Sequence, residues 1–286
     1  MRICIVGGSG MLGHRLLVEL SKAHDTWATV RRMTEPMCWL PNINPGHLID
    51  NVDILDHESI VRAFAISHPD VVINCVGLIK QHEGAQSSLA AIQVNALLPH
   101  RLALLCQATG ARLIHFSTDC VFSGKRGMYT EDDLPDPIDL YGRSKLLGEV
   151  DNLPHVLTLR TSLIGRELST HYGLVEWFLS QQGTAQGYQR AVFSGFPTHI
   201  VADILRDYIL PNPALSGMVH LSAAPINKYE LLTLLKAAFH KEIDIVPDTR
   251  VAVDRSLNSA RFRAATQFEP LTWPQMIASM AALTAD

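Results

Sequence analysis

Short apolar runs alternate with longer stretches of helical spacing along the first half of the chain. The run RICIV at residues 2–6 predicts a strand, and four leucines follow at the spacing of an amphipathic helix, Leu12, Leu16, Leu17 and Leu20. Further strands are predicted at residues 26–30, 70–76, 112–116 and 155–162, and further helices at residues 87–109 and 141–149. Strands that are apolar almost throughout and separated by helices indicate a parallel sheet covered on both faces. We therefore expect an α/β fold with a doubly wound parallel sheet.

The alternation loosens after about residue 166. The remaining predicted elements are a strand at residues 217–222 and helices near residues 174–181, 200–209, 228–240 and 274–283, whereas GYQRAVFSGFPTH at residues 187–199 reads as irregular. We expect residues 1–165 plus about 196–222 to form a Rossmann domain. Residues from about 166–195 and 223–286 should form a smaller substrate lobe over the carboxyl ends of the strands, where open α/β sheets bind ligands.

The composition is that of a globular protein. The chain has 286 residues, 47% of them hydrophobic, which is enough to bury the core of one large domain or two modest ones. The formal net charge of -4 supplies no basic field for nucleic acid or an anionic membrane. No stretch approaches the roughly 18 uninterrupted apolar residues of a membrane span, and GGSG interrupts the apolar start of the chain. We expect a cytoplasmic protein.

Cysteine and histidine usage argues against disulfides and metal. Five cysteines are scattered without CxxC spacing, and an odd number in this arrangement disfavours both a disulfide framework and a zinc site. The 13 histidines include no HxH or HxxxH pair. We therefore expect reduced thiols and no metal.

Three glycines stand between the first predicted strand and the first predicted helix. In IVGGSGMLG, Gly7, Gly10 and Gly13 have the spacing GxxGxxG, with Met11 and Leu12 in the same turn. Such a turn lets the backbone approach a pyrophosphate and offers it the positive end of the helix. An ordinary strand-to-helix turn is the alternative, but the position after a strand and before an amphipathic helix favours a dinucleotide site.

The residues after the second predicted strand indicate which dinucleotide binds. A carboxylate there would accept from the ribose 2′-hydroxyl, whereas arginines accommodate a 2′-phosphate. The chain offers Arg31 and Arg32, and the nearest acid, Glu35, lies further along. The alternative is a solvated arginine pair. The pattern favours NADP(H) over NAD(H) as the cofactor.

A tyrosine and a lysine four residues apart form the candidate acid. In DLYGRSKLLGE, residues 139–149, Tyr141 and Lys145 would lie on one helix face. A free phenol has a pKa near 10, and a nearby ammonium lowers it. Tyr141 could then give a proton to a carbonyl oxygen. Taken alone, the pair also fits an ordinary solvated helix face.

The surroundings of this pair add weight to catalysis. Ser117 and Thr118 end one predicted strand, and Asn74 and Gly77 stand at the exit of its neighbour. A glycine turn, a strand-end hydroxyl and YxxxK, in this order, resemble the extended short-chain dehydrogenase/reductase superfamily.

A longer stretch narrows the resemblance. Residues 117–149, STDCVFSGKRGMYTEDDLPDPIDLYGRSKLLGE, are similar to the dTDP-4-dehydrorhamnose reductase family pattern STDYVFDG followed by YxExDxPxPxxxYGxSKxxGE. LRTS at residues 159–162 and GFPTHIVAD at residues 195–203 also match, and the similarity thins after about residue 222. In that family, NADPH reduces the 4-keto group of a nucleotide-linked 6-deoxyhexulose.

The resemblance implies a role for each matching residue. Thr118 would hydrogen-bond the substrate carbonyl, Tyr141 would be the general acid, and Lys145 would hold the nicotinamide ribose. Asp53 would lie near the adenine, and Val76 and Gly77 would line the cofactor beside Asn74. The remaining residues that we expect at the nucleotide-sugar substrate are Phe122, His171, Trp177 and Arg190, with Lys80, Arg166 and Tyr188 as further candidates.

Cys120 departs from the family pattern, which has a tyrosine there. This change leaves the substrate open, and the lack of a glutamate at the same place disfavours dehydration. Enzymes resembling GDP-fucose synthase hold a cysteine at this offset and pair it with a histidine. Cys120 and His171 could therefore support epimerisation, although an inert buried cysteine and a loop histidine are the simpler interpretation.

Three functions are compatible with the sequence. The first is an NADPH-dependent reductase of a nucleotide-linked ketosugar for polysaccharide or surface-glycan synthesis, and the second is a related epimerase or epimerase-reductase. The third is a nucleotide-binding regulatory subunit resembling the methionine adenosyltransferase β subunit. Retention of Thr118, Tyr141 and Lys145 favours catalysis, because a binding module needs no proton donor. The sequence leaves the oligomeric state open, with a homodimer among the options.

Overall fold

Seven parallel strands form the central sheet of the structure, a computed structural model that describes residues 1–38, 40–79 and 87–283. The strands, in spatial order, are β3 (Leu48–Ile49), β2 (Asp25–Thr29), β1 (Arg2–Val6), β4 (Val71–Asn74), β5 (Arg112–Phe116), β6 (Val156–Arg160) and β10 (Gly217–His220). Each neighbouring pair is parallel. This is the Rossmann order with one added strand, so the predicted α/β class is confirmed.

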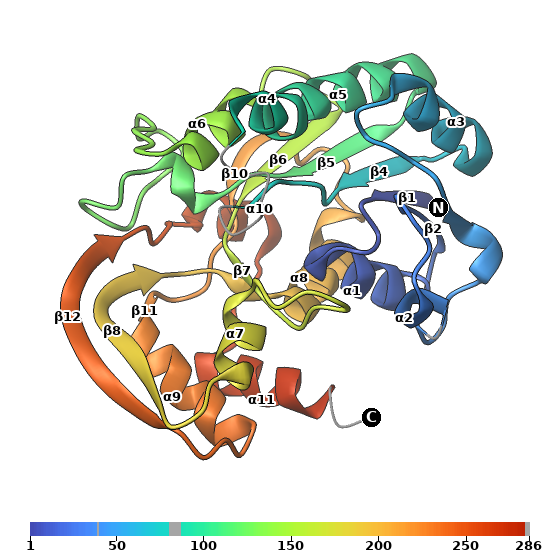
Figure 1. The fold of residues 1–286 in the computed structure, drawn as a ribbon. Coiled ribbons are helices and arrows are strands. Elements are labelled where there is room, and N and C mark those ends of the chain that lie inside the picture. Colours follow the sequence, from blue (N-terminus) through green and yellow to red (C-terminus); the bar gives the residue numbers. More distant parts are fainter. Residues whose placement is uncertain (39, 80–86, 284–286) are drawn as a thin grey trace.

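Helices cover both faces of this sheet (Figure 1). One face carries α3 (His57–Ser67), α4 (Ser88–Ala91), α5 (Leu98–Thr109) and α6 (Leu140–Leu147); the other carries α1 (Met11–Leu20) and α8 (Thr198–Ile204). Side chains of β1 divide between the two layers: Ile3 and Ile5 pack with α1, whereas Cys4 and Val6 pack with α3 and α5. Burial of both faces explains why these strands are apolar throughout.

A continuous helical segment runs through α4, the π-helical turn η3 (Ile92–Leu97) and α5. The segment is long and apolar enough to cross a membrane by length and composition alone, and half of its apolar window is buried. Leu98, Leu102 and Cys106 pack into the core against the sheet. The segment thus serves as a covering helix of the parallel sheet.

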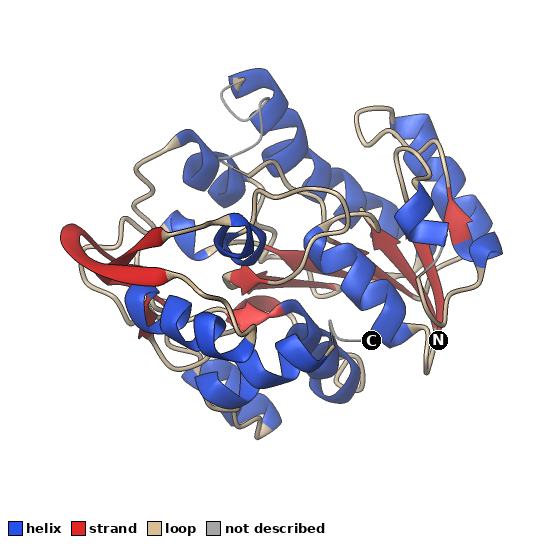
Figure 2. Cartoon of the chain, turned by 60° about the horizontal axis from the view of Figure 1, so that its bottom comes forward, coloured by secondary structure: helices blue, strands red, loops and turns tan. Residues whose placement is uncertain are grey.

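The C-terminal part adds a smaller sheet below the first. It contains β11 (Ile226–Asn227), β8 (Thr184–Phe193) and β12 (Asp244–Asp254), flanked by α7 (Leu174–Ser180), α9 (Lys228–Ala238) and α11 (Trp273–Ala282), whereas α10 (Ala260–Thr266) lies against β10. Strands β8 and β12 form a curved arm, seen at the left of Figure 2. The remaining short elements are α2 (Glu35–Cys38), η1 (Pro45–His47), η4 (Asp119–Val121), β7 (Leu163–Ile164), β9 (Phe196–Pro197) and η5 (Leu205–Ile209).

One sequence prediction is wrong in this region. Residues 187–199 were expected to be irregular, but they form the end of β8, then β9, then the start of α8. Strand β8 buries small residues such as Ala185, Gly187 and Ala191 at alternate positions. These residues carry little hydrophobic signal, so the period of two is weak in the sequence.

Candidate active site

The glycine turn after β1 is as tight as the sequence suggests. Gly7 has φ +92, a conformation that favours glycine, and a Cβ there would lie 2.7 Å from Val76 Cγ2. A Cβ on Gly13 would lie 2.0 Å from the carbonyl oxygen of Gly7. Helix α1 therefore approaches the turn as closely as backbone permits, which is the packing that a dinucleotide-binding turn requires.

The N-terminus of α1 is open for an anion. Gly10 is the N-cap and has no side chain, and Met11 and Leu12 begin the first turn, which contains no acidic residue. The Nδ1 atom of His14 lies 2.9 Å from the carbonyl oxygen of Gly10, a hydrogen bond that stabilises the turn. Unmet N–H groups at the positive end of a helix fit a pyrophosphate.

The remaining expected cofactor residues lie along the same edge of the sheet. Arg31 and Arg32 follow β2 and are exposed, and exposed Asp53 comes soon after β3, with its carboxylate accepting from Leu55 N at 3.0 Å. Asn74 is the last residue of β4, and its side-chain oxygen accepts a hydrogen bond from Val76 N at 3.1 Å.

Asn95, on the π-helical turn η3, fixes the loop that carries Val76 and Gly77. Its Oδ1 accepts from Leu78 N at 2.8 Å and its Nδ2 donates to Leu78 O at 3.1 Å. Gly77 is exposed beside this clamp. The loop thus has a defined position at the edge where the glycine turn lies.

Thr118 and Tyr141 meet where β5 ends and α6 begins. A side-chain hydrogen bond joins them, and the Thr118 hydroxyl also donates to Asp119 Oδ1 at 3.2 Å. The packing of α6 explains the closeness, because a Cβ on Gly142 would lie 2.2 Å from the Cys120 carbonyl oxygen. Asp139 caps the helix by accepting from Gly142 N at 2.8 Å.

The acidity of Tyr141 differs from the sequence expectation. We expected Lys145 to lower the pKa of the phenol, but burial raises it above its usual value, with the neighbouring Cys120 adding to the rise. The bond from Thr118 acts in the opposite direction. The phenol is therefore fully protonated at neutral pH, which suits an acid that donates a proton.

Lys145 is only 4% exposed, and its ammonium is engaged with the sheet. Its Nζ donates to the carbonyl oxygen of Phe116 at 2.6 Å. Burial lowers the pKa of Lys145 to about 8, and the carboxylate of Glu149 opposes this change. The lysine is thus a charged donor near neutral pH at the end of β5.

Three further charged residues act around Thr118 and Tyr141, which form the candidate catalytic pair: Asp119 acts on Tyr141, and Arg255 and Lys228 act on Asp119. Burial raises the pKa of Asp119, while a hydrogen bond with Cys120 and the charges of Arg255 and Lys228 oppose the rise. Lys228 Nζ lies 4.1 Å from the centroid of the Phe193 ring, and burial lowers the pKa of Lys228 to about 8. Sequence reasoning missed Lys228 because nothing in INKYELL distinguishes it from a surface lysine at a helix start.

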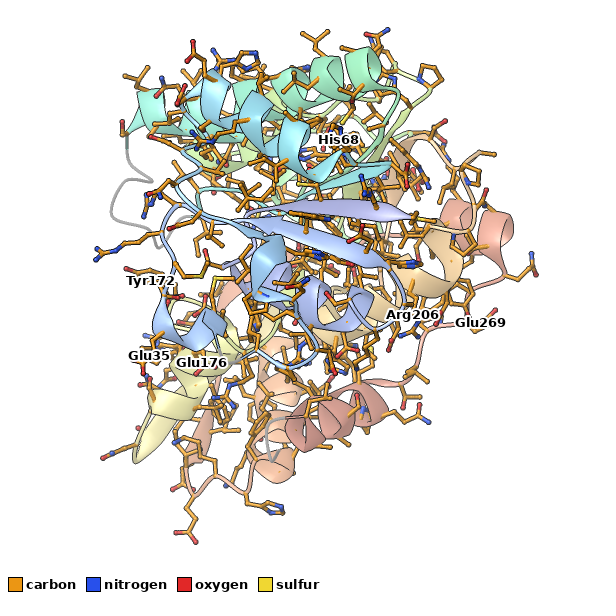
Figure 3. All side chains as sticks on the ribbon, turned by 90° about the vertical axis from the view of Figure 1, so that its right-hand side faces the viewer. Glu35, His68, Tyr172, Glu176, Arg206 and Glu269 are labelled. Carbon is orange, nitrogen blue, oxygen red and sulfur yellow. The ribbon has the colours of Figure 1, made fainter. Side chains whose placement is uncertain are left out.

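Several of the expected substrate residues make defined contacts within the fold. Phe122 is fully buried and stacks on Tyr129 with a centroid separation of 4.2 Å. His171 lies 3.8 Å from Glu176, a residue of α7 labelled in Figure 3, and Arg166 also pairs with Glu176.

Trp177 and Arg190 are surface residues of α7 and β8. The Trp177 side chain is partly exposed and Arg190 is exposed. Tyr188, on the same strand as Arg190, is half-buried, and Lys80 lies outside the described residues. Cys120 lies beside Thr118 and Tyr141, with Tyr141, Asp119 and Lys228 in its electrostatic environment.

The arrangement of sheet, glycine turn and catalytic pair identifies the class of the protein. Its fold is that of the extended short-chain dehydrogenase/reductase type, which the solved neighbours share. More narrowly, the chain belongs to the RmlD substrate binding domain family, whose sequence model matches residues 1–281.

Individual relatives differ in what they are called. Methionine adenosyltransferase 2 subunit beta of Mus musculus is 29% identical over 259 residues, which cover 84% of this chain and 72% of the relative. dTDP-4-dehydrorhamnose reductase of Mycolicibacterium smegmatis is 36% identical over 170 residues, covering 58% of this chain and 46% of the relative. The crystal structure of dTDP-4-dehydrorhamnose reductase from Bacillus anthracis in complex with NADP has a TM-score of 0.81 at 20% identity and covers 99% of both chains.

Proposed function

We propose that the protein is an NADPH-dependent reductase of a nucleotide-linked 4-keto-6-deoxy sugar, acting in the cytoplasm in the synthesis of a polysaccharide or surface glycan. One observation carries this proposal: the phenol of Tyr141 is hydrogen-bonded to Thr118 at the carboxyl edge of the sheet. A pure nucleotide-binding module has no use for such a donor.

The catalytic pair would act on the ketone oxygen. Thr118 and Tyr141 would both donate hydrogen bonds to it, and the phenol would release its proton as charge develops on that oxygen. Bound NADPH supplies the hydride. Lys145, charged below a pKa of about 8, would hold the ribose of the cofactor and stabilise the phenolate that forms.

The cofactor would lie along the edge that runs from the glycine turn to Gly77. Gly7, Gly10 and Gly13 would receive the pyrophosphate, because the first turn of α1 is open and has no acidic residue. The exposed guanidinium groups of Arg31 and Arg32 would bind the 2′-phosphate, which is our reason for preferring NADPH to NADH.

A substrate screen tests the proposal. NADPH oxidation at 340 nm would be followed against dTDP-, UDP- and GDP-linked 4-keto-6-deoxy sugars, after binding of NADPH alone has been measured by fluorescence. We expect turnover with at least one of them. NADPH binding without turnover on any of the sugars would contradict the reductase.

The relatives named methionine adenosyltransferase 2 subunit beta support a second candidate, a regulatory subunit, since they match 84% of this chain. Under this alternative the protein would bind NADP(H) and a catalytic partner chain without turnover. Size-exclusion chromatography with a methionine adenosyltransferase catalytic subunit, with and without NADP, distinguishes the two. A stable complex together with an inactive substrate screen would favour the regulatory role.

A further inference from the structure

A buried ion pair lies behind the catalytic residues. The carboxylate of Glu149 receives two bonds from the guanidinium of Arg160, from Nε at 2.8 Å and from Nη2 at 2.7 Å. Both side chains are only 6% exposed. Two parallel bonds fix the orientation of both groups, and removal of one partner would leave a buried charge without compensation.

This pair joins the two elements that carry the catalytic residues. Glu149 follows the end of α6, the helix of Tyr141 and Lys145, and its Oε1 also accepts from the Ser117 hydroxyl at 2.6 Å. Ser117 immediately precedes Thr118. The Glu149 carboxylate therefore bridges the end of helix α6 and the end of strand β5.

Arg160 anchors the pair on its other side. Its guanidinium carbon lies 5.2 Å from the centroid of the Phe122 ring, and Nη1 lies 3.4 Å from His220 Nε2. His220 Nδ1 lies 3.0 Å from the carbonyl oxygen of Tyr129. Strands β6 and β10 thus hold Arg160, and through it Glu149, in one position.

The Lys145 ammonium is a second cation near Glu149, in addition to Arg160. Two residues of β5 lie near the Lys145 ammonium, Phe116 through its carbonyl oxygen and His115. Burial lowers the pKa of His115 well below its usual value, so this imidazole is neutral. Glu149 follows the helix of Lys145, and its negative charge raises the pKa of Lys145, which opposes the effect of burial. Glu149 is the anion acting on Lys145 within the part of the chain that the structure describes.

We propose that Glu149 is a positioning residue of the active site: clamped by Arg160, its carboxylate holds the ends of β5 and α6 together and keeps the Lys145 ammonium charged. This inference rests on the proposed function for the use of Lys145, but the geometry and the charge of Lys145 can be measured without substrate or cofactor.

Lysine-selective NMR tests the inference directly. The chain has seven lysines, so side-chain 13C and 15N signals of a lysine-labelled sample are few. Loss of one signal in Lys145→Met assigns Lys145, and a pH titration then gives its pKa. In Glu149→Gln/Arg160→Met, which removes both charges and keeps an acceptor for Ser117, we expect Lys145 to titrate at least about one pH unit lower than in the unchanged protein.

Glu131→Gln is the matched control. Glu131 accepts a hydrogen bond from His220 N at 2.8 Å, so this substitution removes a carboxylate from the far side of the same network. The pKa of Lys145 should be the same in this variant as in the unchanged protein. An unchanged Lys145 titration in the folded double variant would overturn the inference. Should that variant not fold, Glu149→Gln/Arg160→Gln replaces it, and failure of both to fold would make the pair a folding element and overturn the positioning role.

The outcome is separable from the fate of the proposed function. If the pKa of Lys145 is lower in the variant but the unchanged protein reduces no ketosugar, the positioning role of Glu149 is supported and the reductase function is refuted. If the unchanged protein oxidises NADPH with a ketosugar but the pKa of Lys145 is the same in the variant, the reductase function is supported and the positioning role of Glu149 is refuted.

Discussion

The Lys145 ammonium donates to the carbonyl oxygen of Phe116 at 2.6 Å, so helix α6 is hydrogen-bonded to strand β5. Phe116 is the last residue of β5, and Thr118 lies two residues beyond it. A side chain from α6 thereby links the helix of Tyr141 to the strand that precedes Thr118. The relative position of Tyr141 and Thr118 depends on contacts between two elements rather than on the YxxxK spacing alone.

Tyr141→Phe should lower turnover by roughly a hundredfold or more while leaving NADPH binding nearly intact, because the phenol is the proposed proton donor and phenylalanine keeps the ring. Steady-state NADPH oxidation and fluorescence titration of NADPH measure the two effects. Undiminished turnover would remove Tyr141 from the mechanism.

Gly142→Ala should destabilise the fold by about 1–3 kcal/mol, because the new methyl group would lie 2.2 Å from the Cys120 carbonyl oxygen. Moving α6 away from this loop should also reduce turnover. Urea unfolding and kinetics measure both, with Arg143→Ala, an exposed neighbour on the same helix, as the control. Equal stabilities of the two variants would contradict the close packing.

Replacing both Arg31 and Arg32 by alanine should weaken NADPH far more than NADH, because NADH has no 2′-phosphate for the guanidinium groups to bind. Dissociation constants for both nucleotides, measured on the same preparation, make NADH the internal control. Equal weakening of the two would reverse the cofactor preference.

Lys228→Met should stabilise the protein at pH 7 by about 1–3 kcal/mol, since the native state holds a lysine whose pKa lies near 8 rather than 10.5. Between those values the unfolded chain binds more protons, so the stability of the unchanged protein rises with pH. The advantage of the variant should therefore shrink as the pH increases from 8 to 10.5. Urea unfolding at pH 7 and pH 10 checks this, and a constant difference would refute it.

Cys120→Ser addresses the epimerase alternative. If the thiol exchanges protons at carbons beside the ketone, deuterium from D2O should enter the substrate with the unchanged protein and not with the variant, while hydride transfer continues. Mass spectrometry of recovered substrate gives the answer. Absence of deuterium in both would leave Cys120 as a packing residue facing Tyr141.

The sequence predicted the parallel sheet because burial on both faces leaves a direct trace in residue type. Strand β5 was predicted with its observed bounds, Arg112–Phe116, and β1 likewise as Arg2–Val6. The glycine turn could also be predicted from the sequence, because a side chain at Gly13 would clash with the Gly7 carbonyl oxygen. Local packing and backbone conformation constrain the amino acid at each such position, so a single chain is enough to see them.

The charges around the catalytic pair were decided by tertiary structure alone. Lys228 comes from the smaller sheet region and Arg160 from the end of β6, yet the first acts on Asp119 and the second clamps Glu149. Burial raises the pKa of Tyr141, opposite to the expectation from YxxxK, and the Lys145 ammonium donates to the Phe116 carbonyl oxygen. Desolvation and charge pairing depend on which distant segments meet, and no local pattern of residues encodes that meeting.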